Sequence, residues 1–229
     1  MNYLTSSHKN STIFFLLLLC WIPMISSSQT ISSGNQLGGG WTQWPPEVHV
    51  EGSRYLYDEF VMGEVFDKKM NIRQAPLRLN LHNDELQYVE DSTIFAFAKP
   101  SSIEKIFLGN EVFIYIKPSS EVEVSGFLKK WNSTYPAILT KMKISFYKES
   151  TEFLGRIKPN RFVRDPDLHY IMKSGTEIIE ITSVKDLIKA LGSHSKELYE
   201  FAKAERISKN NGAELAKLVD YYHSLNDYL

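Results

Sequence analysis

Residue types that could hold a metal ion are spread thinly along this 229-residue chain. No two histidines stand four residues apart, and the zinc-site pattern His-Glu-x-x-His is absent. Two short segments, residues 82–85 and 165–169, do combine histidine with carboxylates. Both also contain Asn, Asp or Pro, which favour turns ahead of strands. We therefore expect two turns there, and neither a metal ion nor another cofactor.

Local catalytic patterns are missing as well. The chain has no Gly-x-Ser-x-Gly nucleophile motif, and no glycine-rich loop precedes a predicted helix to hold phosphate. The adjacent carboxylates Asp58-Glu59 and Glu90-Asp91 fall in predicted strands, where neighbouring side chains point to opposite faces. The catalytic residues are therefore unknown at this point. A hydrolase whose acid and base come from distant strands stays an alternative.

The most unusual feature is a basic stretch. Residues 129–164 contain nine basic and two acidic side chains, a net charge of +7, whereas residues 29–128 carry a net −6 and residues 165–229 a net −3. Such a stretch could bind an anionic surface, meaning lipid head groups, envelope polysaccharide or an acidic protein. Alternatively, the acidic segments fold against it and neutralise it. The candidate contact residues are Lys141, Lys143, Lys148, Arg156, Lys158, Arg161 and Arg164.

The first 28 residues have the three parts of an export signal. Lys9 supplies positive charge, residues 13–25 form an uninterrupted apolar run of 13 residues, and three serines follow. A membrane-spanning helix needs ~20 apolar residues, so an uncleaved anchor is the less favoured alternative. We predict cleavage between Ser28 and Gln29, and no transmembrane span after that cleavage.

The single cysteine, Cys20, lies inside that apolar run. After cleavage the chain has no cysteine, which excludes a disulfide and a thiolate metal site. Small secreted eukaryotic domains usually depend on disulfides. Removal of 28 residues from 229 leaves 201, and a chain of that length can be stabilised by core burial alone. We therefore expect a bacterial cell-envelope protein, periplasmic or extracellular, that meets no nucleic acid.

Beyond the predicted signal, strands dominate. Residues 29–46 are rich in Gly, Ser and Pro and are expected to form a linker. Residues 47–182 contain short strand patterns with no helix between them, which indicates antiparallel pairing in a sandwich or an open barrel. Hairpins are expected over 103–116, around Gly109-Asn110, and over 169–181.

Two kinds of strand pattern occur in this region. Apolar side chains alternate with polar ones at 77–82, 121–124 and 141–146, which predicts one buried and one solvated face. Residues 93–98 and 112–116 are instead rich in β-branched and aromatic side chains on both faces, so they suit central strands.

The apolar period becomes helical after Thr182. A first helix is expected over 184–191, with Ser183 as its N-cap and Gly192 as its stop. A second is expected from about 194 to 207, and a third follows an Asn211 cap with Glu214 at the capping-box position. Helices this short are marginal alone, so they must pack on each other or on the sheet. The sequence therefore predicts an α+β domain whose antiparallel strands precede a helical region at 183–229.

Several short segments carry a family resemblance: Gly63-Glu64-Val65-Phe66, Leu79-Asn80-Leu81, Lys185-Asp186-Leu187 and Leu218-Val219-Asp220-Tyr221-Tyr222. With the order of the parts, they resemble a group of uncharacterised exported Bacteroidetes proteins that have a signal peptide, a β-rich region and final short helices. The resemblance implies the compartment and the architecture, and it implies no activity. Asp91-Ser92-Thr93 also resembles the acceptor of Bacteroidetes O-glycosylation, with Ser92 as the attachment residue.

These features favour an exported, non-enzymatic envelope protein that binds a partner or stabilises a surface assembly. The partner would be the anionic envelope surface or another envelope protein. A carbohydrate-binding module is a further alternative, and it requires Trp41, Trp44 or Trp131 to be exposed on one flat face.

Overall fold

The structure is a computed structural model that describes residues 50–69, 71–120, 123–151, 155, 157–174 and 177–226. The predicted signal peptide, the predicted cleavage position between Ser28 and Gln29, and the predicted linker lie outside the described residues. Arg156, Trp41 and Trp44 lie outside them too.

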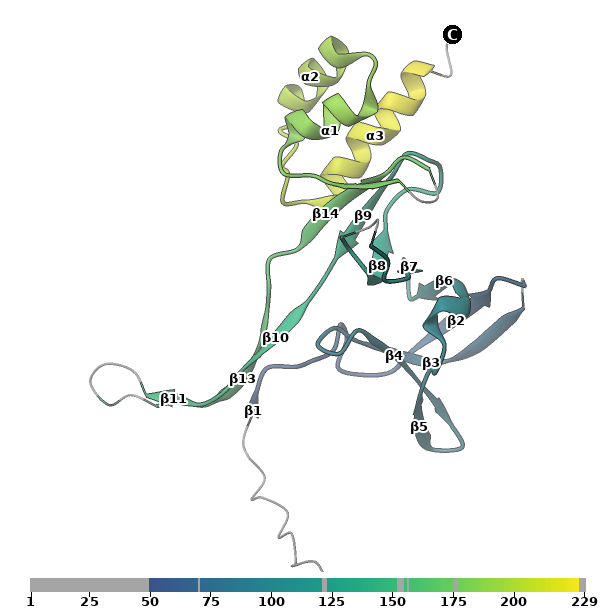
Figure 1. Cartoon of the computed structure of the whole chain (residues 1–229), viewed down its shortest axis with the longest axis vertical. Coiled ribbons are helices and arrows are strands. Elements are labelled where there is room, and N and C mark those ends of the chain that lie inside the picture. The colour runs from purple at the N-terminus through teal and green to yellow at the C-terminus, as the bar shows by residue number, and fades with distance from the viewer. Residues whose placement is uncertain are drawn as a thin grey trace, which may run out of the picture. The chain divides into compact units, whose positions relative to one another are not determined.

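Ten strands form one antiparallel sheet, in the order β15-β14-β9-β8-β7-β6-β2-β3-β4-β5 (Figure 1). In the described part of the chain β5 and β15 do not pair with each other, so the sheet is open. The strands are β2 (Val61–Asp67), β3 (Ile72–Asn80), β4 (Glu85–Glu90), β5 (Thr93–Ala96), β6 (Ile103–Leu108), β7 (Glu111–Ile116), β8 (Gly126–Lys130), β9 (Ala137–Lys141), β14 (Leu168–Met172) and β15 (Ile178–Glu180). A 3-10 turn, η1 (Pro100–Ser102), precedes β6.

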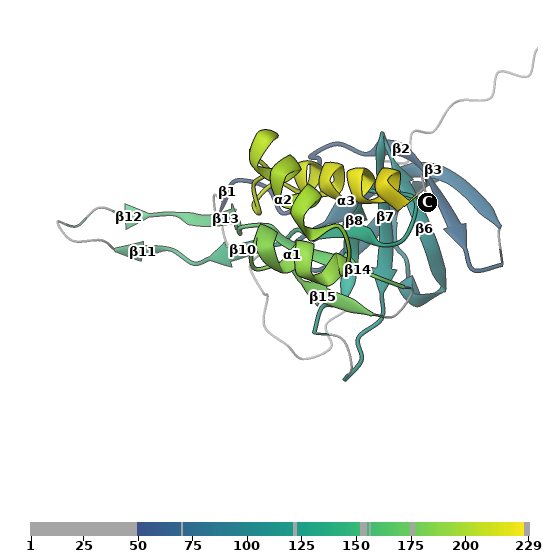
Figure 2. The ribbon, with the colours of Figure 1, turned by 90° about the horizontal axis from the view of Figure 1, so that it is seen from above.

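A long hairpin leaves this sheet between β9 and β14. Its strands β10 (Ile144–Tyr147) and β13 (Asn160–Arg164) pair antiparallel, and β11 (Ser150–Thr151) with β12 (Ile157–Lys158) continues it. Figure 2 shows the hairpin extending away from the ten-stranded sheet. The short strand β1 (Val50–Glu51) pairs with β13 in parallel, unlike the antiparallel pairing expected throughout. The long chain between β1 and β13 supplies the connection that a parallel pair requires.

Both predicted hairpins are confirmed. β6 and β7 are joined by Gly109-Asn110, and Gly109 has a φ of 60° that suits the tight turn. β14 and β15 pair with Tyr170 opposite Glu180.

Two strand predictions were wrong in detail, and a third is tested only in part. The segment at 93–98 is not central: β5 is the edge strand, and all four of its residues are exposed. The pattern at 141–146 covers two strands in different sheets, because β9 ends at Lys141 and β10 begins at Ile144. Residues 121 and 122 lie outside the described residues, and Val124, which is buried, is not in a strand.

The predicted buried face of the 77–82 segment is confirmed, since Leu77 and Leu79 of β3, and Leu81 just after it, are almost completely buried. Asn80, expected on the solvated face, is buried as well. Its Oδ1 accepts hydrogen bonds from the backbone N–H groups of His82 and Asn83, both at 3.1 Å, which compensates the loss of water.

Three helices end the described chain: α1 (Val184–Leu191), α2 (Ser195–Ala204) and α3 (Gly212–Asn226). Ser183 caps α1 by accepting the Asp186 N–H, and Asn211 caps α3 by accepting the N–H groups of Ala213 and Glu214, as predicted. The second helix ends at Ala204, three residues before its predicted end at residue 207. None of the described helices combines the length and apolar character of a bilayer-crossing segment.

The helices pack on one another and on the sheet through Ile138 of β9 and Ile171 of β14, which join Leu187, Leu198 and Leu215 in one buried cluster (Figure 1). Side chains alternate along strands, so the neighbours Leu139 and Tyr170 face the other way and form a separate cluster with Leu128. Burial of apolar surface on both faces of β8, β9 and β14 therefore positions the polar groups described next.

Candidate interaction surface and polar network

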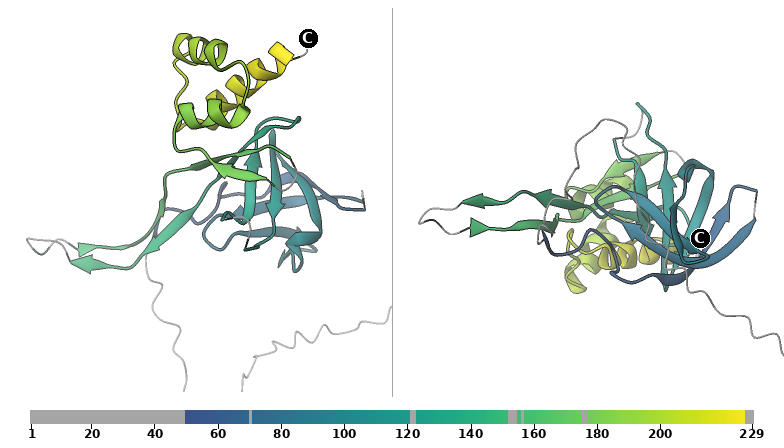
Figure 3. Two further views of the ribbon diagram at one scale, coloured as in Figure 1. Left: turned by 45° about the horizontal axis from the view of Figure 1, so that its top comes forward. Right: turned by 90° about the horizontal axis from the view of Figure 1, so that it is seen from below.

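The long hairpin carries most of the predicted basic stretch. We call its described residues within 143–164 the arm. Between Lys143 and Arg164 the sequence has six basic and two acidic side chains. The arm is visible extending from the sheet in two further views (Figure 3). Its strands pair with each other and with β1, so the backbone hydrogen bonds are made within this small sheet.

Exposed apolar side chains lie among these charges. Ile157 is 63% exposed, Tyr147 45%, Val163 39% and Phe146 37%. Phe146 and Phe162 face each other across the strands, with ring centroids 5.1 Å apart. A cluster of large exposed apolar groups beside cations is a common property of surfaces that bind a partner or a membrane.

The six predicted contact residues that the structure describes do not form one patch. Lys141 is outside the arm and binds the Asp84 carboxylate at 2.8 Å. Arg164 makes a forked contact with Asp167, at 3.0 and 3.1 Å from one guanidinium nitrogen. The alternative that acidic residues neutralise the stretch therefore holds for these two cations.

Four other candidates, Lys143, Lys148, Lys158 and Arg161, lie on the arm. Lys143 and Lys148 are exposed, and within the described residues neither makes an ion pair. Arg161 lies across from Tyr147, with its guanidinium carbon 5.4 Å from the ring centroid. Lys158 is half-buried in β12. The arm thus presents lysine and arginine beside aromatic and aliphatic side chains.

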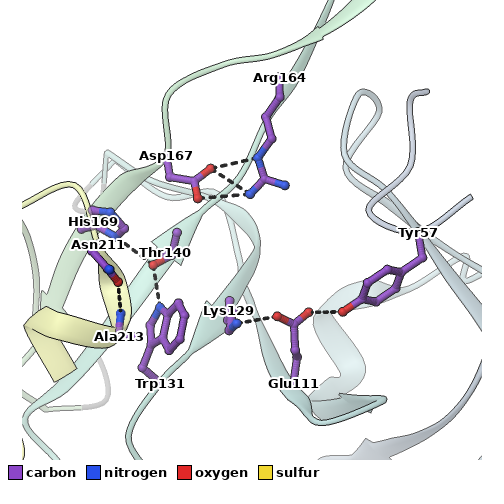
Figure 4. A network of polar contacts seen from close by, with 10 residues as sticks. All are labelled: Tyr57, Glu111, Lys129, Trp131, Thr140, Arg164, Asp167, His169, Asn211 and Ala213. Carbon is purple, nitrogen blue, oxygen red and sulfur yellow. Dashed lines mark hydrogen bonds and ion pairs between the residues drawn. The ribbon is translucent and has the colours of Figure 1, made fainter. Parts of the chain in front are cut away.

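A separate polar network crosses β7, β8, β9 and β14 (Figure 4). The Tyr57 hydroxyl donates to Glu111 Oε2 at 2.7 Å, and Lys129 Nζ pairs with the other oxygen of that carboxylate. Burial, and then the Glu111 carboxylate, raise the pKa of Tyr57 to about 12. Lys129 also lies 3.7 Å from the Trp131 ring centroid. Sequence reasoning missed these contacts, because 54 residues separate Tyr57 from Glu111.

The network continues through Thr140 to a buried histidine. The Trp131 indole N–H donates to Thr140 Oγ1 at 2.7 Å, and that oxygen lies 2.8 Å from His169 Nδ1. Burial lowers the pKa of His169, which favours the neutral ring, while the Asn210 backbone and Asp167 oppose the shift. The Glu111 carboxylate is already paired with the Lys129 ammonium and hydrogen-bonded by the Tyr57 hydroxyl, and His169 is only 4% exposed. These contacts tie strands together rather than presenting an acid and a base to a substrate.

The turn predicted at 82–85 is present, whereas no turn forms at 165–169, where residues 165–167 are irregular and Leu168 and His169 belong to β14. Both segments engage their polar groups within the protein. In the first, His82 Nδ1 lies 3.0 Å from the Ile144 carbonyl oxygen and Asp84 pairs with Lys141. In the second, Asp167 binds Arg164 and His169 bonds to Thr140. Across the described part of the chain, no three His, Cys, Asp or Glu side chains gather as a metal site would require.

Ser92 lies at the exposed tip of the β4–β5 hairpin. It and Asp91 have φ values of 62° and 49°, which is the backbone of a type I′ turn. The hydroxyl is therefore on an accessible loop, and glycosylation there stays a prediction.

Trp131 does not form a flat open platform. Its indole nitrogen bonds to Thr140, its ring faces the Lys129 ammonium, and Gly212 at the start of α3 packs against it. The only tryptophan in the described residues therefore serves packing, and the other two candidates, Trp41 and Trp44, lie outside them.

Comparison with known proteins adds no assignment: no known protein family, no curated protein and no solved structure matches this chain. The resemblance to exported Bacteroidetes proteins therefore stays a prediction.

Proposed function

We propose that this protein is an exported, non-enzymatic component of a bacterial cell envelope, and that the arm docks it on an anionic phospholipid surface. The observation that carries the proposal is the combination, on one extended hairpin, of exposed Tyr147 and Ile157 with Lys143 and Lys148, two exposed lysines that make no ion pair with any described residue. Cations attract the surface, and apolar side chains enter the interfacial layer.

Charge complementarity selects an anionic partner. The segment 143–164 has an excess of four basic side chains over acidic ones. Each Lys or Arg close to an anionic membrane surface contributes about 1 kcal/mol, so Lys143 and Lys148 together contribute about 2 kcal/mol. The aromatic and aliphatic groups add affinity that salt does not screen.

Vesicle binding tests the proposal. The purified protein is mixed with vesicles of phosphatidylcholine alone or with phosphatidylglycerol, and the bound fraction is measured by sedimentation. The double change Lys143→Gln and Lys148→Gln should weaken binding to the anionic vesicles about 30-fold, which corresponds to about 2 kcal/mol.

The matched control is Lys196→Gln with Lys217→Gln. Both are exposed lysines on helices, so the net charge changes equally while the arm is untouched. This control should bind as the unmodified protein does. Equal loss in the two double variants, or equal binding to neutral and anionic vesicles, would refute docking through the arm.

Export has its own test. Expression in a Bacteroidetes host, followed by fractionation and N-terminal sequencing, should yield an envelope protein that begins at Gln29. Recovery of the full-length chain in the cytoplasmic fraction would refute export without bearing on the vesicle result.

A further inference from the structure

A cavity of about 440 Å³ lies over β6, β7 and β8 and the loop that follows β8. The strand register puts Phe107, Val112 and Lys130 in one row across the three strands, since Phe107 pairs with Val112 and Val112 with Lys130. Ile114 and Tyr135 complete the apolar wall. The volume is that of ordinary small-molecule sites.

Two lysines at this cavity are held without a carboxylate partner. Lys130 Nζ donates to the Ser133 carbonyl oxygen at 3.1 Å and lies 4.4 Å from the Tyr135 ring centroid. Lys105 Nζ lies 4.7 Å from the ring centroid of Phe66. Within the described residues neither ammonium is in an ion pair.

The electrostatics favour an anion. The charged residues that line the cavity are one acid, Glu104, and two bases, Lys105 and Lys130, so the lining carries a net charge of +1. Burial lowers the pKa of Lys130, and although Glu104 opposes the shift, Lys105 adds to it. A negative group that entered the cavity would stabilise both ammoniums in a partly desolvated position.

We propose that this cavity binds a small organic carboxylate. The carboxylate lies between the ammoniums of Lys105 and Lys130, and an aliphatic or aromatic body covers Phe107, Val112 and Ile114. Asn132 takes no part, because its amide oxygen accepts the Ile138 N–H and its amide nitrogen is bound to α3.

Calorimetric titration with defined probes tests this site. Octanoate represents an aliphatic acid and 4-phenylbutyrate an aromatic one, and either should bind. Octanamide, the uncharged isostere, should bind about ten-fold more weakly, because its carbonyl oxygen accepts a hydrogen bond without the attraction of a negative charge. Octylammonium should bind more weakly still, because the two lysine ammoniums repel it. Failure of both carboxylates to bind at millimolar concentration, or equal affinity for octylammonium, would overturn the proposal.

Two single changes should act in opposite directions. Lys130→Met keeps the aliphatic stem and should weaken octanoate binding about ten-fold, whereas Glu104→Gln should strengthen it about two- to five-fold. Lys217→Met, on the exposed side of α3, is the control. If Lys130→Met does not fold, Lys105→Met replaces it. An unchanged octanoate affinity in a folded Lys130→Met or Lys105→Met variant rules out the site. The arm variant Lys143→Gln with Lys148→Gln is a second control, and its octanoate affinity should equal that of the unmodified protein.

Discussion

Replacing Gly126 with alanine should destabilise the fold far more than the same change at Gly109. Both glycines have positive φ, 91° at Gly126 and 60° at Gly109. A Cβ at Gly109 would have no heavy atom within 4 Å. At Gly126 it would overlap the Asp84 carboxylate and lie 2.6 Å from Lys141 Nζ.

The expected loss of stability in each variant follows from these surroundings. Alanine at positive φ lowers the free energy of unfolding by roughly 1–2 kcal/mol. The reduced conformational freedom of the unfolded chain offsets about 0.4–1 kcal/mol of this loss, so Gly109→Ala should destabilise the protein by about 1 kcal/mol. Gly126→Ala adds about 2 kcal/mol of overpacking. It also displaces Asp84 from the Phe127 N–H, now at 3.0 Å, which adds about 1 kcal/mol. The total is about 4 kcal/mol.

Urea unfolding followed by circular dichroism measures both variants. The free energy of unfolding should differ between them by about 3 kcal/mol. In an Asp84→Ala background the obstructing carboxylate is gone, and Lys141 Nζ, the end of a flexible side chain that Asp84 no longer holds, can move away. Gly126→Ala should then cost only about 1 kcal/mol, as Gly109→Ala does. Equal losses at the two glycines in the unmodified background would refute the reasoning.

Three further changes test the hairpin tip and the polar network. Ser92→Gly should stabilise the protein by about 0.5–1 kcal/mol in thermal unfolding, because glycine suits the positive φ of this turn, and a lower melting temperature would contradict it. Thr140→Val should cost about 2–4 kcal/mol in urea unfolding, since it leaves the Trp131 N–H and the His169 ring without their shared partner; a loss under 1 kcal/mol would show that the link is dispensable. Because the pKa of His169 is below its ordinary 6.5, the unfolded chain takes up this proton first as the pH falls. Stability should therefore be full above pH 6.5 and decline below it, and His169→Asn should flatten that decline; an unchanged pH profile would exclude His169 as its source.

Part of the candidate surface could be predicted from the sequence. The basic stretch is a property of composition, and the arm does contain Lys143, Lys148, Lys158, Arg161 and Arg164. That Lys141 is neutralised could not be predicted, because its partner, Asp84, is 57 residues away in the chain. Arg164, in contrast, pairs with Asp167 only three residues further on. The exposure of Tyr147 could not be predicted either, since alternation cannot say where a strand leaves the main sheet.

The sequence by itself determined the local elements. Gly109-Asn110 specifies a hairpin, and Ser183, Gly192 and Asn211 specify helix ends, because turns and caps depend on neighbouring residues. The tertiary structure alone decided that β5 lies at the edge of the sheet. It also decided that Thr140 and His169 meet in the interior, and where the lysine-lined cavity forms. These features depend on strand register and packing between residues far apart in the chain, and such contacts leave no periodic mark in the sequence.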